Sequence, residues 1–212
     1  VYRHAIVVPL LKQSSLDVDD LKSFCPVSNL TFVSKILERI VFKQFLQYLI
    51  VNNFLPRFQS GFRRFHSTET ALLQVLSVLF DASDHNQVSL LTLLDMSAAF
   101  DCVNHDILLR RLHSSYGVCG SALNLFKSYL DKRTQQVFYA DILSDVVDVL
   151  SGVPQGSVLG PLLFTLYTAD ILCVINEYSF KGFAYADDVQ LIASTSPGEF
   201  DVLIGRLLKC LD

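Results

Sequence analysis

The stretch that decides the fold of this chain is FAYADDVQL, residues 183–191. Apolar residues stand on both sides of two adjacent aspartates, Asp187 and Asp188, and this pattern predicts two strands joined by a tight turn. The turn places both carboxylates at its tip. Adjacent like charges repel each other, so this position favours full solvation or a nearby cation. Because Asp-Asp is also ordinary turn chemistry, the pair alone leaves both interpretations open.

A further carboxylate, Asp95, stands at the end of another predicted strand. Residues 89–94 read SLLTLL, a nearly all-apolar run that predicts a buried strand. A charge at the end of a buried strand is costly unless something compensates it, so Asp95 either caps the following turn or holds a cation. Carboxylates fixed on strands, with two divalent ions about 4 Å apart, are the arrangement that nucleotidyl transfer requires.

The composition predicts a folded protein of one domain or two small subdomains. Of the 212 residues, 51% are hydrophobic and 18% are charged, which excludes a disordered or fibrous chain. The net charge of −4 argues against a nucleic-acid binder, yet residues 1–88 carry +2 and residues 89–212 carry −6. A basic part beside an acidic part suits phosphate binding next to metal binding; scattered surface charge is the alternative.

No membrane segment is expected. The longest stretch without charge, residues 149–169, contains glycines and prolines that would interrupt a spanning helix. The five cysteines are scattered and include no C-x-x-C pair, so we expect free thiols in a reducing compartment. The chain begins at Val1 and not at Met, and we expect it to be part of a longer reading frame.

Hydrophobic periodicity predicts both strands and helices. Further strands are expected at residues 3–12, 135–140 and 145–150, the last two as a hairpin. Helices are expected at about residues 36–49, 71–80, 105–114, 121–130 and 162–174. Ser28 or Ser34 is the candidate N-cap of the first helix, and Ser67 or Thr68 that of the second.

Two loops have residue types that suit a ligand. Residues 57–66, RFQSGFRRFH, mix aromatic and basic side chains and suit phosphate or base contacts, with a solvated hairpin as the equal alternative. Residues 151–157, SGVPQGS, open an apolar helix; their glycines permit close approach of a ligand, and Gln155 offers a donor and an acceptor. For this second loop a plain strand-to-helix connection is the simpler interpretation.

Taken together, these segments resemble the reverse transcriptase domain of non-LTR (LINE-type) retrotransposons. Residues 95–101 (DMSAAFD), 152–161 (GVPQGSVLGP) and 185–188 (YADD) occur in the order of the three core motifs of reverse transcriptases. Residues 21–38 and 59–72 resemble the finger segments of the same family. The resemblance covers nearly the whole chain. It implies an α/β (α+β) right-hand polymerase fold, with fingers at residues 1–88 and, at residues 89–212, a palm of antiparallel sheet backed by helices.

The resemblance implies an RNA-directed DNA polymerase that adds deoxynucleotides to a primer 3′-hydroxyl by two-metal catalysis. By position, Asp95, Asp187 and Asp188 correspond to the catalytic carboxylates, and with the Met96 carbonyl they would hold two Mg²⁺ ions, with Mn²⁺ as a substitute. The implied partners are an RNA template, a DNA primer and deoxynucleoside triphosphates. No membrane is implied, the expected location is the nucleus or cytoplasm, and no oligomeric state follows.

The resemblance also implies roles for residues outside the carboxylate group. Phe100, five residues after Asp95, would exclude a 2′-hydroxyl and so select deoxynucleotides, with a core aromatic as the alternative. Gln155 and Gly156 would line the nucleotide pocket, and Arg63 would reach the triphosphate. The candidates for template or primer contact are Lys12, Lys22, Lys35 and Tyr185, with solvated surface as the alternative for the lysines.

The chain also departs from the family pattern. Cys25 stands where an arginine is usual, so we expect a cation that contacts the template or triphosphate to be missing. Arg64-Phe65 stands where a small or glycine-containing pair is usual, so we expect a distorted fingertip turn. The chain ends at Asp212, and we expect the next palm motif, with its lysine, and the thumb to be missing. An inactive relic that at most binds nucleic acid is therefore the first alternative. The second is an RNA-dependent RNA polymerase, which shares the palm; Phe100 argues against it.

Overall fold

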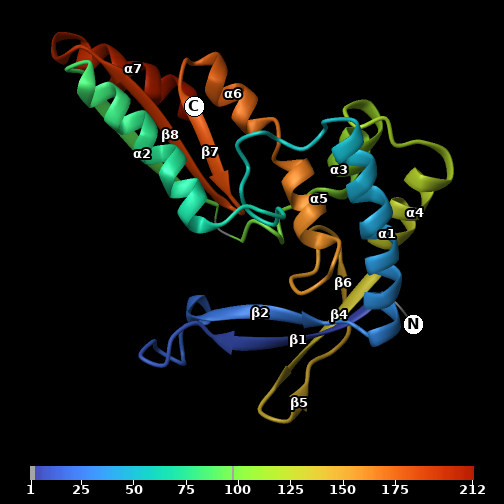
Figure 1. Cartoon of the computed structure of the whole chain (residues 1–212). Coiled ribbons are helices and arrows are strands. Elements are labelled where there is room, and N and C mark those ends of the chain that lie inside the picture. Colours follow the sequence, from blue (N-terminus) through green and yellow to red (C-terminus); the bar gives the residue numbers. More distant parts are fainter. Residues whose placement is uncertain (1–2, 97) are drawn as a thin grey trace. The chain divides into compact units, whose positions relative to one another are not determined.

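The computed structural model describes residues 3–96 and 98–212, which form a mixture of helices and strands (Figure 1). Packing divides the chain into two compact units, each built from two separate segments. Unit 1 comprises Val1–Phe54 and Ala98–Tyr167, and unit 2 comprises Leu55–Ser97 and Thr168–Asp212. Each unit has its own sheet and its own helices.

The sheet of unit 1 has the strand order β2-β1-β4-β5, and β6 also pairs with β4. Strand β1 (His4–Leu11) runs antiparallel to β2 (Phe24–Asn29) and parallel to β4 (Arg133–Tyr139). Strands β5 (Ile142–Leu143) and β6 (Val147–Val149) pair antiparallel with β4. The sequence predicted β1, β4 and β6 but neither β2 nor β5. Pro26 lies inside β2, and proline is tolerated there because β2 is an edge strand.

The helices of unit 1 are α1 (Phe32–Val51), α3 (His105–Ser114), α4 (Gly120–Leu130) and α5 (Gly160–Tyr167), and a short 3-10 turn covers Leu21–Ser23. Their most deeply buried apolar side chains include Leu49, Leu108, Leu112, Leu130 and Leu163.

The N-cap expected for α1 was wrong. Thr31 caps this helix, and its side-chain oxygen accepts the Ser34 N–H at 3.3 Å. Ser28 belongs to β2, and Ser34 lies inside the helix, where its hydroxyl donates to Glu38 at 3.2 Å. Helix α1 begins at Phe32, before the start that periodicity predicted at about residue 36, so the extended residue before the first helical turn is Thr31.

Unit 2 contains a three-stranded antiparallel sheet in the order β3-β8-β7. Its strands are β3 (Val88–Asp95), β7 (Lys181–Tyr185) and β8 (Asp188–Thr195). Three helices, α2 (Thr68–Asp84), α6 (Ile171–Glu177) and α7 (Phe200–Leu211), cover the sheet (Figure 1), and Pro197–Glu199 form a 3-10 turn before α7. Ser67, one of the two candidate N-caps, caps α2 and forms a capping box with Thr70.

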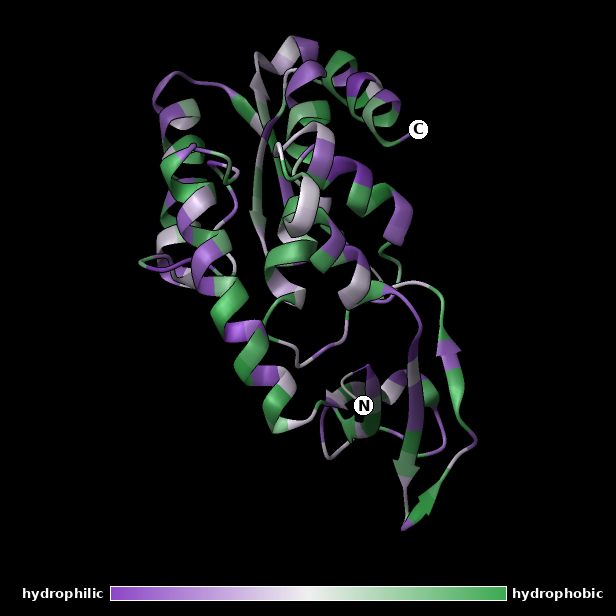
Figure 2. Cartoon of the chain, turned by 90° about the vertical axis from the view of Figure 1, so that its right-hand side faces the viewer, coloured by the Kyte–Doolittle hydropathy of each residue, from purple (hydrophilic) through white to green (hydrophobic). Residues whose placement is uncertain are grey.

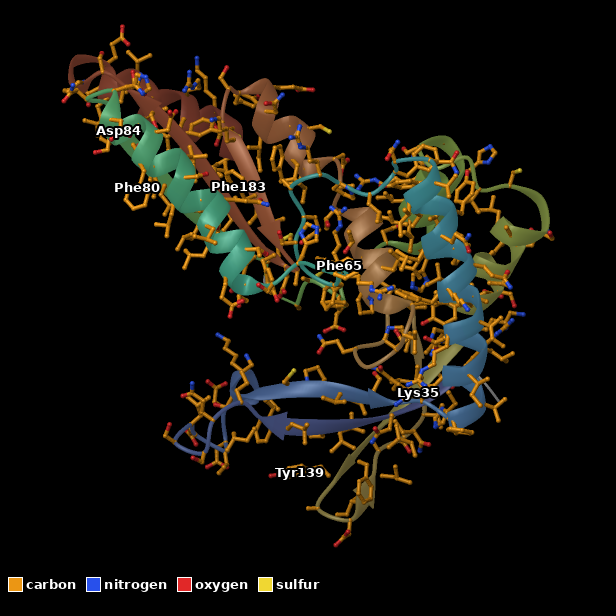
Figure 3. All side chains as sticks on the ribbon, viewed as in Figure 1. Lys35, Phe65, Phe80, Asp84, Tyr139 and Phe183 are labelled. Carbon is orange, nitrogen blue, oxygen red and sulfur yellow. The ribbon has the colours of Figure 1, made fainter. Side chains whose placement is uncertain are left out.

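Helices pack against both faces of the unit 2 sheet, and neighbouring residues of a strand point to opposite sides. The burial expected for the strand at residues 89–94 was wrong, because β3 lies at the edge of the sheet, where Leu91 is 40% and Leu93 69% exposed. Ile192 and Phe183 pack with Val75 of α2. Leu191 packs with Ile175 of α6 and Leu203 of α7 on the other face. Phe80, also on α2, is 65% exposed and points away from Phe183 (Figure 3). The expected antiparallel sheet backed by helices is therefore present, and the α/β fold class is confirmed.

The single helix expected at residues 162–174 is wrong, because two helices, α5 and α6, share this stretch. Helix α5 packs against α3, whereas α6 packs against β7. These different packing partners break the helix between Tyr167 and Ile171, although no glycine or proline marks the break. Hydrophobic and hydrophilic segments alternate along the ribbon of the chain (Figure 2).

Other expectations concern the whole chain. All five cysteines are free, as predicted. Within residues 3–96 and 98–212, no helix combines the length and the apolar character needed to cross a membrane. The division at residue 88 into fingers and palm stays a prediction, because the two compact units follow packing and each draws on both halves of the chain.

Candidate functional site

Asp95 and Asp188 face each other across two neighbouring strands of unit 2. Asp95 is the last residue of β3, Asp188 is the first of β8, and the two are direct partners in the antiparallel register. Residues directly opposite in such a pair project to the same face, with Cβ atoms about 4.5–5.5 Å apart. Asp187 lies in the two-residue turn between Tyr185 and Asp188. The predicted strand–turn–strand with carboxylates at its tip is therefore present.

The negative charges of Asp95, Asp187 and Asp188 repel one another. Partial burial, and then the negative charges of Asp187 and Asp95, raise the pKa of Asp188 above its usual range. Both Asp95 and Asp188 are exposed enough to meet a ligand from solvent. A cation beside them would reverse this penalty, since an opposite charge favours the ionised form.

The donor set fits a hard divalent cation. Among the residues that the structure describes, no three His, Cys, Asp or Glu side chains form a group that could hold a metal ion by themselves. Mg²⁺ does not require such a cage, because it usually takes one or two carboxylates and keeps waters and substrate phosphates as its other ligands. Met96 follows Asp95 and packs its side chain against the core around Leu191. Ser97 of the same motif lies outside the described residues.

Arg63, the expected triphosphate ligand, holds its own loop in this structure. Its Nη1 donates to the main-chain oxygens of Pro56 at 2.7 Å and Gln59 at 3.3 Å. Burial lowers the pKa of its guanidinium group. The loop therefore uses part of the Arg63 side chain for its own structure, and the role of Arg63 toward a nucleotide stays a prediction.

The neighbouring fingertip turn contains two aromatic residues with positive φ. Phe62 has a φ of 58° and Phe65 a φ of 65°, in the left-handed region that favours glycine. Phe65 is 88% exposed (Figure 3), and the Arg64 guanidinium lies 4.7 Å from the centre of its ring. The distortion expected where Arg64-Phe65 replaces a smaller pair stays a prediction.

In unit 1, the loop with Gln155 and Gly156 packs closely on β2. The Gln155 main-chain oxygen accepts the Ser28 N–H at 2.8 Å, and its side-chain oxygen lies 3.5 Å from the Cys25 thiol. Gly156 has a φ of 97°, and a Cβ there would lie 2.9 Å from the Ser28 oxygen, so a larger residue would be strained. Cys25, the departure from the family pattern, therefore contacts the expected nucleotide-binding glutamine.

Phe100 is fixed against the other end of this loop. Its ring stacks on Phe164 of α5, with centroids 4.7 Å apart and planes 22° from parallel. Its main-chain oxygen accepts the Val153 N–H at 2.8 Å. Gly152 has a φ of 90°, and a Cβ there would lie 2.8 Å from the Asp101 Cα. The backbone at Phe100 and the Gly-Val-Pro-Gln-Gly loop are thus locked together.

The remaining candidates are distributed over both units. Lys12 and Lys22 are exposed and Lys35 is half-buried (Figure 3), all three in unit 1. Tyr185 is half-buried at the end of β7, opposite Asp188. Unit 2 brings together Asp95, Asp187, Asp188 and Tyr185, and also contains Arg63; unit 1 contains Phe100, Gln155 and Gly156.

Sequence reasoning missed Gln59, whose buried side-chain amide contacts the hairpin turn that carries Asp187. It appeared in the sequence only as part of a finger motif. The Gln-Ser-Gly sequence after Phe58 could have indicated this contact. A glycine there permits another backbone segment to approach closely.

The fold has counterparts among solved polymerases. Apo telomerase from Candida tropicalis, truncated from its C-terminal domain, matches 97% of this chain and 46% of its own length with a TM-score of 0.67. Telomerase from the same organism in complex with a fragment of telomeric RNA matches 96% of this chain and 38% of its own, also at 0.67. Both are 12% identical in sequence, so the likeness concerns the fold.

A profile of the family "Reverse transcriptase (RNA-dependent DNA polymerase)" matches residues 11–212, and the chain belongs to this family. The RNA-directed DNA polymerase from mobile element jockey of Drosophila funebris is 33% identical over 91% of this chain and 21% of its own length. The probable RNA-directed DNA polymerase from transposon BS of Drosophila melanogaster is 33% identical over 82% of this chain and 20% of its own. The chain thus spans about a fifth of the length of these relatives.

Proposed function

We propose that this chain is the polymerase part of a retrotransposon reverse transcriptase, which copies RNA into DNA by adding deoxynucleotides to a primer 3′-hydroxyl. The observation that carries the proposal is the direct opposition of Asp95 and Asp188 on neighbouring strands, with Asp187 beside them. Family membership and the names of the relatives supply the reaction class. The partners are then an RNA template, a DNA primer and deoxynucleoside triphosphates, and we place the protein in the nucleus or cytoplasm.

In this proposal Asp95, Asp187 and Asp188, with the Met96 carbonyl, hold divalent cations, with Mg²⁺ preferred and Mn²⁺ as a substitute. Such ions, when bound, lower the pKa of an attacking hydroxyl and neutralise charge on the leaving pyrophosphate. The protein's part is to hold the carboxylates in register on neighbouring strands. Burial and the charges of Asp187 and Asp95 raise the pKa of Asp188, and a bound cation would favour its ionised form.

We assign the other residues by position. Phe100 selects deoxynucleotides by excluding a 2′-hydroxyl, and its stacking on Phe164 supports a fixed ring. Gln155 and Gly156 line the nucleotide pocket, supported by their tight attachment to β2. Arg63 binds triphosphate through guanidinium N–H groups other than those of Nη1, which bonds to its own loop. The template and primer contacts are assigned to Lys12, Lys22, Lys35 and Tyr185.

The test is primer extension on poly(rA)/oligo(dT) with the 212-residue chain and Mg²⁺. We expect incorporation of deoxythymidine that disappears in Asp187→Asn and persists in Asp84→Asn, a control that removes an equal charge from an exposed site on α2. Activity that survives in Asp187→Asn would refute the site assignment. A chain that neither extends primers nor binds Mn²⁺ would favour the inactive relic, and preferential incorporation of ribonucleotides would favour an RNA-dependent RNA polymerase.

A further inference from the structure

The turn between β7 and β8 begins at a residue in an unfavourable conformation. Ala186 has a φ of 58°, in the left-handed region that residues with a side chain rarely adopt. Asn, Asp or Gly is the usual residue at such a position of a two-residue hairpin turn. An alanine stays there only if the surrounding structure holds it. Because Asp187 and Asp188 follow directly, whatever holds Ala186 also sets where their carboxylates lie.

The side chain of Gln59 supplies this support. Its Nε2 donates to the Ala186 oxygen at 3.0 Å, and its Oε1 accepts the Ala186 N–H at 3.0 Å. The same Oε1 accepts the Gly61 N–H at 2.9 Å. A single planar amide thus satisfies both main-chain polar groups of Ala186, which requires a donor and an acceptor side by side. Gln59 is 3% exposed, so water does not compete for these bonds.

The backbone around Gln59 is joined to the same end of β7. Ala184 donates its N–H to the Phe58 oxygen at 2.8 Å, and its own oxygen accepts the Ser60 N–H at 2.8 Å. These bonds form a short parallel bridge between Gln59 and Ala184. A Cβ at Gly61 would lie 2.1 Å from the Ala186 nitrogen, so only glycine allows the segment to approach this closely.

We propose that Gln59 is a positioning residue for the aspartate pair: its side-chain amide fixes the Ala186 main chain and thereby the turn that carries Asp187 and Asp188. The Gln-Ser-Gly segment is then an internal brace of unit 2, whereas the sequence alone left phosphate or base contacts and a solvated hairpin as equal alternatives for residues 57–66. One part of this inference rests on the proposed function: that the carboxylates which the brace positions bind metal. The brace itself is a property of the fold.

The test compares two variants of the whole chain with a matched control. Gln59→Met keeps the volume and removes all three hydrogen bonds. Gln59→Glu keeps the accepting oxygen, loses the donor, and sets a carboxylate against the Ala186 oxygen. Gln74→Met makes the same chemical change at a half-buried site on α2. Urea unfolding of each protein establishes that it still folds cooperatively.

The first measurement is hydrogen exchange of the Ala186 N–H by NMR. We expect this turn amide to be protected in the wild type, about tenfold faster in Gln59→Met, as loss of a hydrogen bond implies, and unchanged in Gln74→Met. Gln59→Glu should keep the protection, because its oxygen still accepts the N–H. An unprotected Ala186 amide in the wild type would overturn the inference, even if neither variant could be purified.

The second measurement is the Kd for Mn²⁺, which a purely structural role would not change once folding is intact. We expect it to rise at least about tenfold in Gln59→Met, the usual result when a residue that orients metal ligands is removed. An unchanged Kd in a variant whose Ala186 amide has lost protection would overturn the positioning role. If the wild type binds no Mn²⁺, the proposed function fails, whereas the exchange of Ala186 still decides whether the brace exists.

Discussion

The side-chain carboxylate of Glu38 accepts the main-chain N–H of Val158 at 2.7 Å and that of Leu159 at 3.1 Å. Glu38 lies on α1 and is 3% exposed. The two N–H groups immediately precede α5, where a helix leaves such donors without partners inside the helix. A negative charge at this end is also favoured by the helix dipole. Glu38 thereby anchors the end of the Gly-Val-Pro-Gln-Gly loop to the long helix of unit 1.

Glu38→Ala should therefore reduce the free energy of unfolding by about 3 kcal/mol, because one buried and one half-buried main-chain donor lose their acceptor. Glu38→Gln retains one accepting oxygen and should lose about 1 kcal/mol. Urea unfolding measures both. Arg39→Ala, an exposed neighbour on the same helix, is the control and should stay within about 0.5 kcal/mol of wild type. Equal stability of Glu38→Ala and Arg39→Ala would contradict the anchoring role.

The stability of the chain should fall at alkaline pH through Tyr129. Burial, and then the charge of Glu38, raise the pKa of this phenol above its usual value, and its hydroxyl lies 3.5 Å from the Glu38 carboxylate. Below a pH of about 10 the phenol is protonated in both the folded and the unfolded state, so it contributes no difference. Above that pH only the unfolded state ionises, and the folded state loses stability as the pH rises further.

Tyr129→Phe should remove that loss. The measurement is the free energy of unfolding between pH 8 and pH 11, with Tyr139→Phe as the control because Tyr139 is 54% exposed. We expect a shallower decline above about pH 10 in Tyr129→Phe than in the wild type and in Tyr139→Phe. Identical slopes in all three proteins would show that Tyr129 titrates normally.

Removing one charge from the aspartate group should stabilise the chain in the absence of metal. Asp188→Asn relieves the repulsion that raises the pKa of Asp188, and exposed charge pairs are worth about 0.2–1 kcal/mol, so we expect a Tm higher by about 1–3 °C at pH 7. A raised carboxyl pKa means that the folded state loses stability as the pH rises through it, so the gain should vanish near pH 3, where Asp188 is protonated in both states.

Millimolar Mn²⁺ should reverse the order of these proteins. The wild type should gain thermal stability with the ion, and Asp188→Asn should gain less, because binding to the folded state alone shifts the equilibrium by mass action. Asp84→Asn, at an exposed site on α2, should respond like the wild type. An equal response of all three proteins would mean that the ion binds elsewhere.

Two glycine-to-alanine changes in unit 2 should have opposite effects. Gly61→Ala places a Cβ 2.1 Å from the Ala186 nitrogen, and forced overpacking of this kind costs about 1–3 kcal/mol. Gly205 lies inside α7 with no atom within 4 Å of the added Cβ, and alanine there should stabilise by about 1 kcal/mol. Thermal unfolding of both variants checks the signs. A neutral Gly61→Ala would be incompatible with the close approach of residues 59–61 to the hairpin.

Phe100→Val should raise incorporation of ribonucleotides relative to deoxynucleotides by about tenfold, a range typical of pockets that discriminate by size. The measurement is the ratio of kcat/KM for the two sugars. Phe126→Leu is the control: Phe126 is a core residue of unit 1 that packs on Phe45, with ring centroids 4.8 Å apart, so its change lowers stability without altering sugar preference. An unchanged ratio in Phe100→Val would leave Phe100 as a core aromatic.

The sequence by itself determined the features that depend on neighbouring residues. The apolar residues on both sides of Asp187 and Asp188 predict the hairpin, and the apolar run before Asp95 predicts a strand, because each signal lies in a few adjacent residues. The capping box at Ser67 and Thr70 also lies within one helical turn. The order of motifs along the chain was enough to indicate the family.

Only the tertiary structure decided which distant residues meet. Gln59 and Ala186 are 127 residues apart, and Glu38 and Val158 are 120 apart, so no periodicity connects them. The break between α5 and α6 and the edge position of β2 likewise follow from packing partners that a local pattern does not contain. The physical reason is common to all of these cases: a buried polar group or a helix end is satisfied by whichever backbone the fold brings to it.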